Sequence, residues 1–232
     1  MEDSFRFKQF SVRNRDSALK VGTDAVLLGA AMTINPQGRS ALDIGTGTGV
    51  IALMAAQRSS YSSIIAVEID APSASEAKYN FSKSPWSERL SVINADLNDY
   101  RPAETFDHIF SNPPYFIDSL LNPDQREATA RHTCSLSAAD ICRFAQNNLS
   151  EEGYLSLILP SEDEKTICRT ASSFGLSLFR ILRIRTTGRK PVRRIVVEFK
   201  RNRSAVRQEE LTLQTGSMRT PEYQALTQDF YL

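Results

Sequence analysis

The stretch LDIGTGTGV, residues 42–50, places three glycines directly after a short apolar run. Residues 40–44, SALDI, have the composition of a buried strand, and residues 50–58, VIALMAAQR, predict the helix that follows it. Glycines between the two let the backbone turn sharply and let a ligand approach closely. Their spacing is G-x-G-x-G, whereas a nicotinamide-binding loop requires G-x-G-x-x-G and a glycine where Val50 stands. The stretch therefore predicts a strand–loop–helix unit with a ligand crevice at the carboxyl end of the strand.

Strand-like and helix-like segments alternate on both sides of this loop. The predicted strands are residues 63–69, 90–96, 106–111 and 153–160, and the predicted helices are 73–83 and 137–150. Strands separated by helices of this length are typical of βαβ units and a parallel sheet. Ser137 is the expected N-cap of the last helix, and Thr23 or Asp24 that of an earlier helix, AVLLGAAM. Beyond residue 175, LSLFRILRIR and RRIVVEFKR flank the turn-like TTGRKP, which predicts an antiparallel hairpin at the sheet edge.

Three acidic residues stand at or near the ends of successive predicted strands. Glu68 ends the second strand, nineteen residues after Gly49, where a carboxylate can accept hydrogen bonds from both hydroxyls of a ribose. Asp96 ends the third strand and is placed to accept from an adenine amine. Asp43 lies just before the glycine loop and is placed to hold a cationic amine. Each acid alone could be a solvated strand end, but together with the loop they fit an adenosine without a pyrophosphate.

With these residues the sequence resembles the class I methyltransferases, which use S-adenosylmethionine. The resemblance implies a seven-stranded, mostly parallel α/β sheet with helices on both faces and an antiparallel C-terminal hairpin. It also implies S-adenosylmethionine as the cofactor. The residues expected to bind it are Asp43, Gly45, Thr46, Gly47, Gly49, Glu68, Ile69, Asp96, Leu97 and Asn112.

The fourth predicted strand ends in NPPY, residues 112–115. The exocyclic amine of adenine is a poor nucleophile because its lone pair is delocalised into the ring. Two acceptors on its hydrogens, the Asn112 side-chain oxygen and the Pro113 carbonyl, would aim the lone pair at the sulfonium methyl. Two consecutive prolines fix the backbone and so hold that carbonyl in place. Tyr115 offers a ring on which the target base can stack, so these residues are the expected catalytic group.

A closer resemblance extends over essentially the whole chain. FRFKQFSV, LKVGTDAVLLGA, SPW, QRE and YQALTQDFYL, in this order, resemble the bacterial tRNA(Val) adenine N6-methyltransferases. That family modifies the adenine just 3′ of the anticodon, so the resemblance implies tRNA as the partner. In that family the KVGTD segment lies over the methionine end of the cofactor. Carried over, Lys20 and Thr23 join the expected cofactor-binding residues.

Positive charge is concentrated near the C-terminus. From Arg180 to Arg207 there are eleven Lys or Arg and one acid, a balance of +10, so the remainder of the chain carries −9. Arginine predominates and suits bidentate phosphate contacts, which favours nucleic acid over a merely solvated sheet edge. The expected RNA-binding residues are Arg189, Lys190, Arg193 and Arg194 in the hairpin, with Arg126 and Arg131 in the 116–134 loop.

Length and composition set the remaining expectations. The 232 residues predict one domain, with residues 1–39 as an extension and a helix, 40–175 as the cofactor-binding core and 176–232 as the basic hairpin and tail. The N-terminus has no signal-peptide core, and no apolar run approaches the roughly 20 residues of a membrane span. Three scattered cysteines and two histidines predict neither disulfides nor a metal site. A cytoplasmic monomer with no membrane partner and no metal is expected.

Other functions fit parts of the same pattern. NPPY also occurs in methyltransferases of release-factor glutamine amides and in DNA adenine methyltransferases. The former resemble a longer chain with an N-terminal helical domain, and the latter usually carry a target-recognition domain for which no residues remain. Methylation of another adenine or guanine, in rRNA or DNA, also stays open. A non-catalytic RNA-binding module on a decayed fold is disfavoured because Gly45, Gly47, Glu68 and Asn112 are all present.

Overall fold

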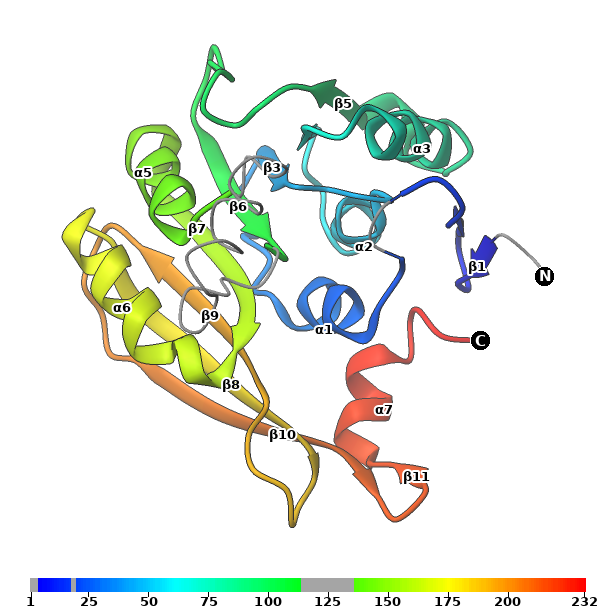
Figure 1. Cartoon of the computed structure of the whole chain (residues 1–232), viewed down its shortest axis with the longest axis vertical. Coiled ribbons are helices and arrows are strands. Elements are labelled where there is room, and N and C mark those ends of the chain that lie inside the picture. Colours follow the sequence, from blue (N-terminus) through cyan, green and yellow to red (C-terminus); the bar gives the residue numbers. More distant parts are fainter. Residues whose placement is uncertain (1–3, 18–19, 114–135) are drawn as a thin grey trace, which may run out of the picture.

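A nine-stranded sheet forms the centre of the computed structural model, which describes residues 4–17, 20–113 and 136–232. Its strands are β3 (Ser40–Ile44), β4 (Ser63–Glu68), β5 (Leu90–Asn94), β6 (Phe106–Ser111), β7 (Leu149–Pro160), β8 (Ser177–Thr187), β9 (Arg194–Lys200), β10 (Arg207–Thr215) and β11 (Met218–Arg219). They are ordered β11-β10-β8-β9-β7-β6-β3-β4-β5 (Figure 1). Strands β3 to β7 are parallel, and β9 is antiparallel to both β7 and β8. Strand β8 therefore points the same way as β3 to β7. The carboxyl ends of β3 to β8 lie at one edge of the sheet.

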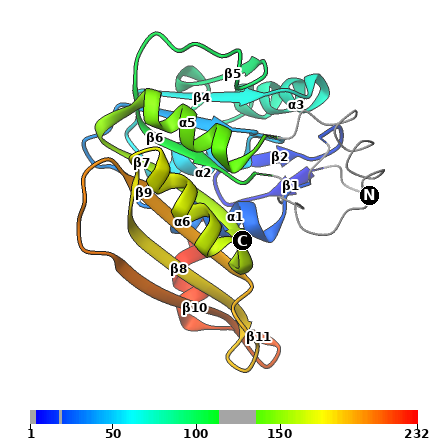
Figure 2. The ribbon, with the colours of Figure 1, turned by 60° about the vertical axis from the view of Figure 1, so that its left-hand side comes forward.

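Helices cover both faces of the sheet, each face with its own hydrophobic core. One face carries α1 (Thr23–Ala31), α2 (Val50–Arg58) and α3 (Ala71–Ser82), and the other carries α5 (Ala138–Asn148) and α6 (Glu164–Ser173). Figure 2 shows α5 and α6 in front of the sheet. Three further elements are α7 (Pro221–Thr227) and the short 3-10 helices η1 (Ser87–Arg89) and η2 (Ser161–Asp163). Ser137 caps α5 through a capping box, as predicted, whereas the N-cap of α1 is Gly22, so the expected capping by Thr23 or Asp24 is wrong.

The C-terminal part differs from the expected terminal hairpin. Strands β8 and β9 do form an antiparallel hairpin, but β10 pairs in parallel with β8 and removes it from the sheet edge. Two strands, β10 and β11, thus extend the expected seven to nine. The sequence RQEELTLQT of β10 contains two leucines among seven polar residues, so hydrophobic alternation gave little sign of a strand there. Helix α7 then packs against β10 and α1 (Figure 1).

The two chain ends pack against each other beside α3 and α7. Strands β1 (Ser4–Arg6) and β2 (Ser11–Arg13) form a separate antiparallel pair. The Lys8 amide donates to the Phe230 carbonyl at 2.8 Å, and the rings of Phe7 and Tyr231 stack with centroids 6.2 Å apart. Within the described residues no helix has the length and apolar character needed to cross a membrane.

A buried hydrogen-bonded chain crosses the sheet beneath the functional edge. The Tyr61 hydroxyl lies 3.2 Å from His108 Nδ1, and His108 Nε2 lies 2.8 Å from Ser156 Oγ. Ser156 donates to Glu198 at 2.9 Å, and Glu198 also accepts from Arg180 at 2.9 Å. Because Ser156 donates onward to Glu198, its oxygen accepts from His108 Nε2, so this nitrogen carries a proton, and a neutral ring can then accept from the Tyr61 hydroxyl at Nδ1. Burial agrees, because it lowers the pKa of His108 to about 4.

Candidate active site

The glycine loop lies at the carboxyl end of β3, between β4 and the start of α2. Gly45, Gly47 and Gly49 have φ of 66°, 54° and 82°, a left-handed conformation that other residues rarely adopt. A Cβ on Gly49 would lie 2.5 Å from the Phe81 ring, whereas a Cβ on Gly45 would meet no atom within 4 Å. Gly49 therefore serves close packing, and Gly45 opens the backbone to a ligand.

Asp43 has an unsatisfied oxygen beneath this loop. The side chain is fully buried, and Oδ2 accepts from the Thr46 hydroxyl at 2.6 Å. Oδ1 is buried and has no partner at full hydrogen-bond geometry in the described part of the chain, although the Ala52 amide of α2 is near enough to lower the pKa of the carboxyl. Burial raises the pKa of Asp43 to about 7, although the Thr46 hydrogen bond opposes the rise. A buried carboxylate oxygen without a donor is an acceptor held ready for a ligand, and a cationic amine would satisfy it.

Glu68 ends β4 beside the loop and organises its backbone. Its Oε2 accepts from the Gly47 amide and its Oε1 from the Asp70 amide, both at 2.9 Å. Asp70 in turn caps α3 by accepting from the Ser73 amide. Glu68 is 8% exposed, so its carboxylate is oriented before any ligand arrives. Ile69 next to it is 51% exposed, so a large apolar side chain stands open beside Glu68.

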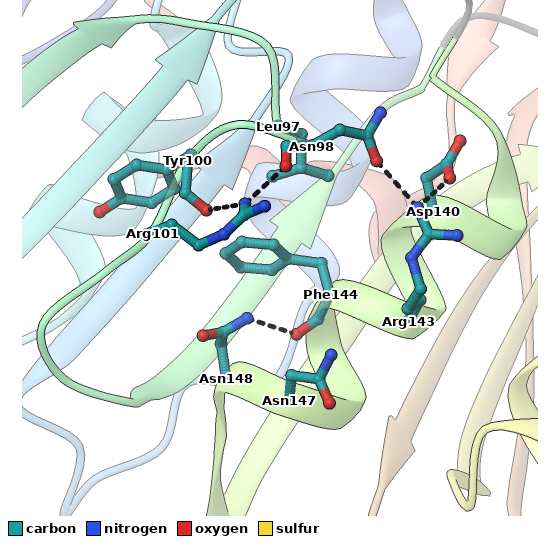
Figure 3. A pocket seen from close by; sticks show the side chains of 9 residues that line it. All are labelled: Leu97, Asn98, Tyr100, Arg101, Asp140, Arg143, Phe144, Asn147 and Asn148. Carbon is teal, nitrogen blue, oxygen red and sulfur yellow. Dashed lines mark hydrogen bonds and ion pairs between the residues drawn. The ribbon is translucent and has the colours of Figure 1, made fainter.

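The segment after β5 carries the third acid and is anchored to α5. Asp96 Oδ1 accepts from the Asn98 amide at 2.8 Å, and Arg143 donates to the Asn98 side chain at 2.8 Å. Tyr100 stacks on Phe144 with ring centroids 6.1 Å apart. Figure 3 shows the bond between Arg143 and Asn98, and the side chains of Tyr100 and Phe144, around a pocket of about 380 Å³ that is also lined by Leu97. The arginine and aromatic contacts hold the Asp96 turn in place from the α5 face.

The end of β6 brings Asn112 and Pro113 next to the glycine loop. Ile44 pairs with Ser111, whose hydroxyl donates to the Ile44 carbonyl at 2.7 Å. Gly45 directly follows β3, and Asn112 directly follows β6. The two motifs are therefore neighbours at one edge of the sheet. Asn112 is half-buried and Pro113 is buried. Tyr115, Arg126 and Arg131 lie outside the described residues.

Known proteins are similar in sequence to this chain over nearly its full length. The model of the methyltransferase small domain family matches residues 16–165. A tRNA1(Val) (adenine(37)-N6)-methyltransferase of Bacteroides thetaiotaomicron is 40% identical over 230 residues, covering 98% of this chain and 97% of that protein. One of Photobacterium profundum is 38% identical, covering 100% of this chain and 99% of that protein. The chain belongs to this tRNA1(Val) (adenine(37)-N6)-methyltransferase family.

Solved structures confirm the class I methyltransferase fold of this family member. A structure described as a predicted O-methyltransferase from Agrobacterium tumefaciens matches with a TM-score of 0.70 at 23% identity, over 89% of this chain and 96% of that chain. A methyltransferase from Pyrococcus furiosus matches with a TM-score of 0.59 at 20% identity, over 82% and 89%. The α/β sheet predicted from the glycine loop is therefore confirmed.

The segment leading to Lys20 is fixed by two α3 side chains that the sequence had not singled out. Glu76 accepts from the backbone amides of Arg15, Asp16 and Ser17 at 2.7–3.0 Å. Asn80 accepts from the Arg13 amide at 2.8 Å and donates to the Thr48 carbonyl, also at 2.8 Å. These bonds tie residues 13–17 to the glycine loop. Both side chains are buried in the structure. In the sequence, the only sign of their role is that two polar residues stand four apart on one predicted helix.

Lys20 and Thr23, predicted at the methionine end of the cofactor, are both exposed. Lys20 Nζ donates to the Arg15 carbonyl at 2.6 Å. Neither side chain contacts Asp43 or Glu68 in the described structure, so their role at the cofactor stays a prediction.

The basic residues divide into paired and exposed groups. Arg180 pairs with Glu198 and Glu209, Arg183 with Glu164, and Arg185 with Glu210, at 2.5–2.9 Å. Two of these acids come from β10, so this strand neutralises part of the excess charge of β8. Arg194, predicted to bind RNA, bonds to Asp24 of α1 at 2.8 Å. The other predicted hairpin residues, Arg189, Lys190 and Arg193, are exposed at the β8–β9 connection.

Proposed function

We propose that this chain transfers a methyl group from S-adenosylmethionine to the exocyclic N6 amine of an adenine in a tRNA anticodon loop. The proposed substrate is a valine tRNA, and the target is the adenine 3′ of the anticodon. The observation that carries the proposal is 40% identity over nearly the full length to a tRNA1(Val) (adenine(37)-N6)-methyltransferase. The adjacency of Asn112-Pro113 and the glycine loop supports it, because acceptor and methyl donor must meet at one place.

The residues at the crevice fit the cofactor. The unpartnered Asp43 Oδ1 suits its ammonium group, and the open space at Gly45 admits its adenosine. Glu68 would accept from the ribose hydroxyls and Asp96 from the adenine amine, while Ile69 and Leu97 contact the base. When bound, S-adenosylmethionine supplies a methyl group on a positively charged sulfur. Lys20 and Thr23 would close the crevice over the methionine end.

Asn112 and Pro113 would perform the positioning part of the chemistry. Their carbonyl oxygens accept the two N6 hydrogens and direct the nitrogen lone pair at the methyl group. Tyr115 would stack on the base. This nitrogen would receive the methyl group of the bound cofactor, and the methylated amine would then lose one proton to water. A buried neutral His108 is not needed as a base, and its bonds to Tyr61 and Ser156 keep it in the sheet.

A methylation assay on defined RNA tests the function. The purified protein and S-adenosylmethionine are incubated with an unmodified valine tRNA transcript and with a transcript in which guanine replaces the adenine 3′ of the anticodon. Nucleoside mass spectrometry should find N6-methyladenosine only in the first. Equal methylation of both transcripts would show that the adenine 3′ of the anticodon is not the target. Absence of methylation in tRNA, with methylation of rRNA, DNA or a glutamine peptide in parallel assays, would reject the substrate.

A further inference from the structure

A second pocket, of about 590 Å³, opens at the same sheet edge as the glycine loop. It lies between the start of α1, the carboxyl ends of β8 and β10, and α7. Its lining includes Thr23 and Asp24 of α1, Arg193 and Arg219, and the rings of Tyr223 and Tyr231. The volume is in the range of pockets that hold small organic ligands. The α1 residues that form its wall belong to the segment proposed to cover the cofactor, so the two sites are neighbours.

The charge of this pocket is positive and in part uncompensated. Among the described residues, Asp24 is the one acid that lines it, and Asp24 is already bonded to Arg194 at 2.8 Å. Arg193 and Arg219 are exposed, and neither has a carboxylate partner in the described part of the chain. Arginines in this state attract phosphate groups. The pocket therefore selects an anionic ligand.

Aromatic rings give the pocket a second kind of contact. The guanidinium of Arg219 lies 4.5 Å from the ring centroid of Tyr231 and 5.7 Å from that of Tyr223. Unpaired RNA bases stack on tyrosine rings and on arginine planes. An arginine supported by two tyrosines beside a second free arginine is thus suited to both parts of a nucleotide.

The fold holds these rings in place without any ligand. Tyr231 stacks with Phe7, and its amide donates to the Thr227 carbonyl at 3.1 Å. Thr220 caps α7 by accepting from the Tyr223 amide at 3.2 Å, and its hydroxyl donates to the Thr212 carbonyl of β10. The C-terminal segment is therefore held in place at Thr220 and at Tyr231. The pocket thus has fixed walls, as expected of a ligand-binding site.

We propose that this pocket binds an unpaired nucleotide of the substrate RNA that is adjacent to the target adenine. Arg193 and Arg219 contact its phosphate groups, and its base stacks against the Arg219–Tyr231 pair. The inference rests on the proposed function, which supplies the RNA, and assigns to the C-terminal helix a part in holding it. An anticodon loop suits such a site because its bases can turn outward without the opening of a duplex.

Binding of an anticodon stem-loop by fluorescence anisotropy tests the pocket. Arg219→Ala should raise the Kd for this RNA about tenfold and lower the log–log salt slope by about 0.7–0.9. Affinity for S-adenosylhomocysteine, measured by calorimetry, should not change. Arg203→Ala is the matched control, because Arg203 is an exposed arginine in the β9–β10 connection at the opposite edge. Its RNA affinity should stay within about twofold of the wild type.

A base analogue reports on stacking directly. 2-Aminopurine placed at the nucleotide before or after the target adenine should lose fluorescence on binding to the wild type and regain it with Arg219→Ala. If the wild type methylates tRNA but Arg193→Ala and Arg219→Ala both bind it normally, the pocket proposal is wrong. If the variants bind weakly but neither flanking analogue responds, a nucleotide in the pocket is also ruled out. RNA binding that depends on Arg219 without any methylation would instead refute the proposed function and leave the pocket standing.

Discussion

Protonation of Asp43 should control how tightly the cofactor binds. Burial raises the pKa of this carboxyl to about 7 in the free protein. An ammonium group at Oδ1 binds the carboxylate and not the neutral acid, so the pKa falls in the complex. The affinity is then highest at about pH 7–8, where the carboxylate is ionised and the ligand ammonium still holds its proton, and it decreases about tenfold for each unit below pH 7, or about 100-fold at pH 5. Because the free protein holds the proton and the complex does not, binding near pH 6 also releases a proton.

Calorimetry with two ligands isolates this effect. S-adenosylhomocysteine carries the same ammonium group and has no methyl to transfer, whereas 5′-methylthioadenosine keeps the adenosine and lacks the amino-acid part. The affinity of the first should follow the titration of Asp43, and that of the second should not. Asp43→Asn should bind S-adenosylhomocysteine weakly at every pH and without proton release. Equal pH dependence for both ligands, or a flat profile for S-adenosylhomocysteine, would refute the role of Asp43.

Three further predictions concern single residues. Asn112→Ala should leave cofactor affinity unchanged in calorimetry and reduce the turnover of tRNA by about 10²–10³, because one preorganised acceptor is lost; a collapse of cofactor binding would contradict this. Glu68→Ala should weaken cofactor binding by about 1.5–3 kcal/mol, with much of the rate restored at saturating cofactor, and normal affinity would remove the ribose role. Burial lowers the pKa of His108 to about 4. Measured in urea relative to His108→Gln, in which the contributions of the other titrating groups are shared, the wild type should therefore lose about 3 kcal/mol of unfolding free energy between pH 7 and pH 4, and an equal pH dependence of the two proteins would contradict this.

The glycine loop and its neighbours at the sheet edge could be predicted from the sequence because their parts are local. Each motif can be recognised within a few residues of the sequence. They are the glycines that need positive φ, an acid that ends a strand, and a double proline after the next buried strand. The parallel sheet then places all strand carboxyl ends at one edge, so motifs far apart in the chain become neighbours without any knowledge of their contacts. The pairing of Ile44 with Ser111 is such a case.

The partners of charged residues could not be predicted in the same way. The sequence shows three arginines at 180, 183 and 185 but not the acids with which they pair. Glu209 and Glu210 reach two of them only because β10 pairs in parallel with β8. Glu76 and Asn80 escaped notice for a related reason, since their partners are backbone amides of the N-terminal segment more than fifty residues away. Such contacts depend on tertiary register, which leaves no local pattern.

The distribution of free charge changes where RNA should be sought. The sequence gives a balance of +10 between Arg180 and Arg207, which invites the idea that the whole hairpin grips the backbone. Ion pairs with acids of β9, β10 and α6 hold the arginines in the middle of β8, and a paired arginine must lose its carboxylate before it can hold a phosphate. Among the described residues, exposed basic side chains at the carboxyl ends of β8 and β10 include Arg189, Lys190 and Arg193, together with Arg219 from outside the basic stretch. RNA held there lies at the same edge of the sheet as Asn112 and the glycine loop, so the location of the unpaired charge matters more for function than its total.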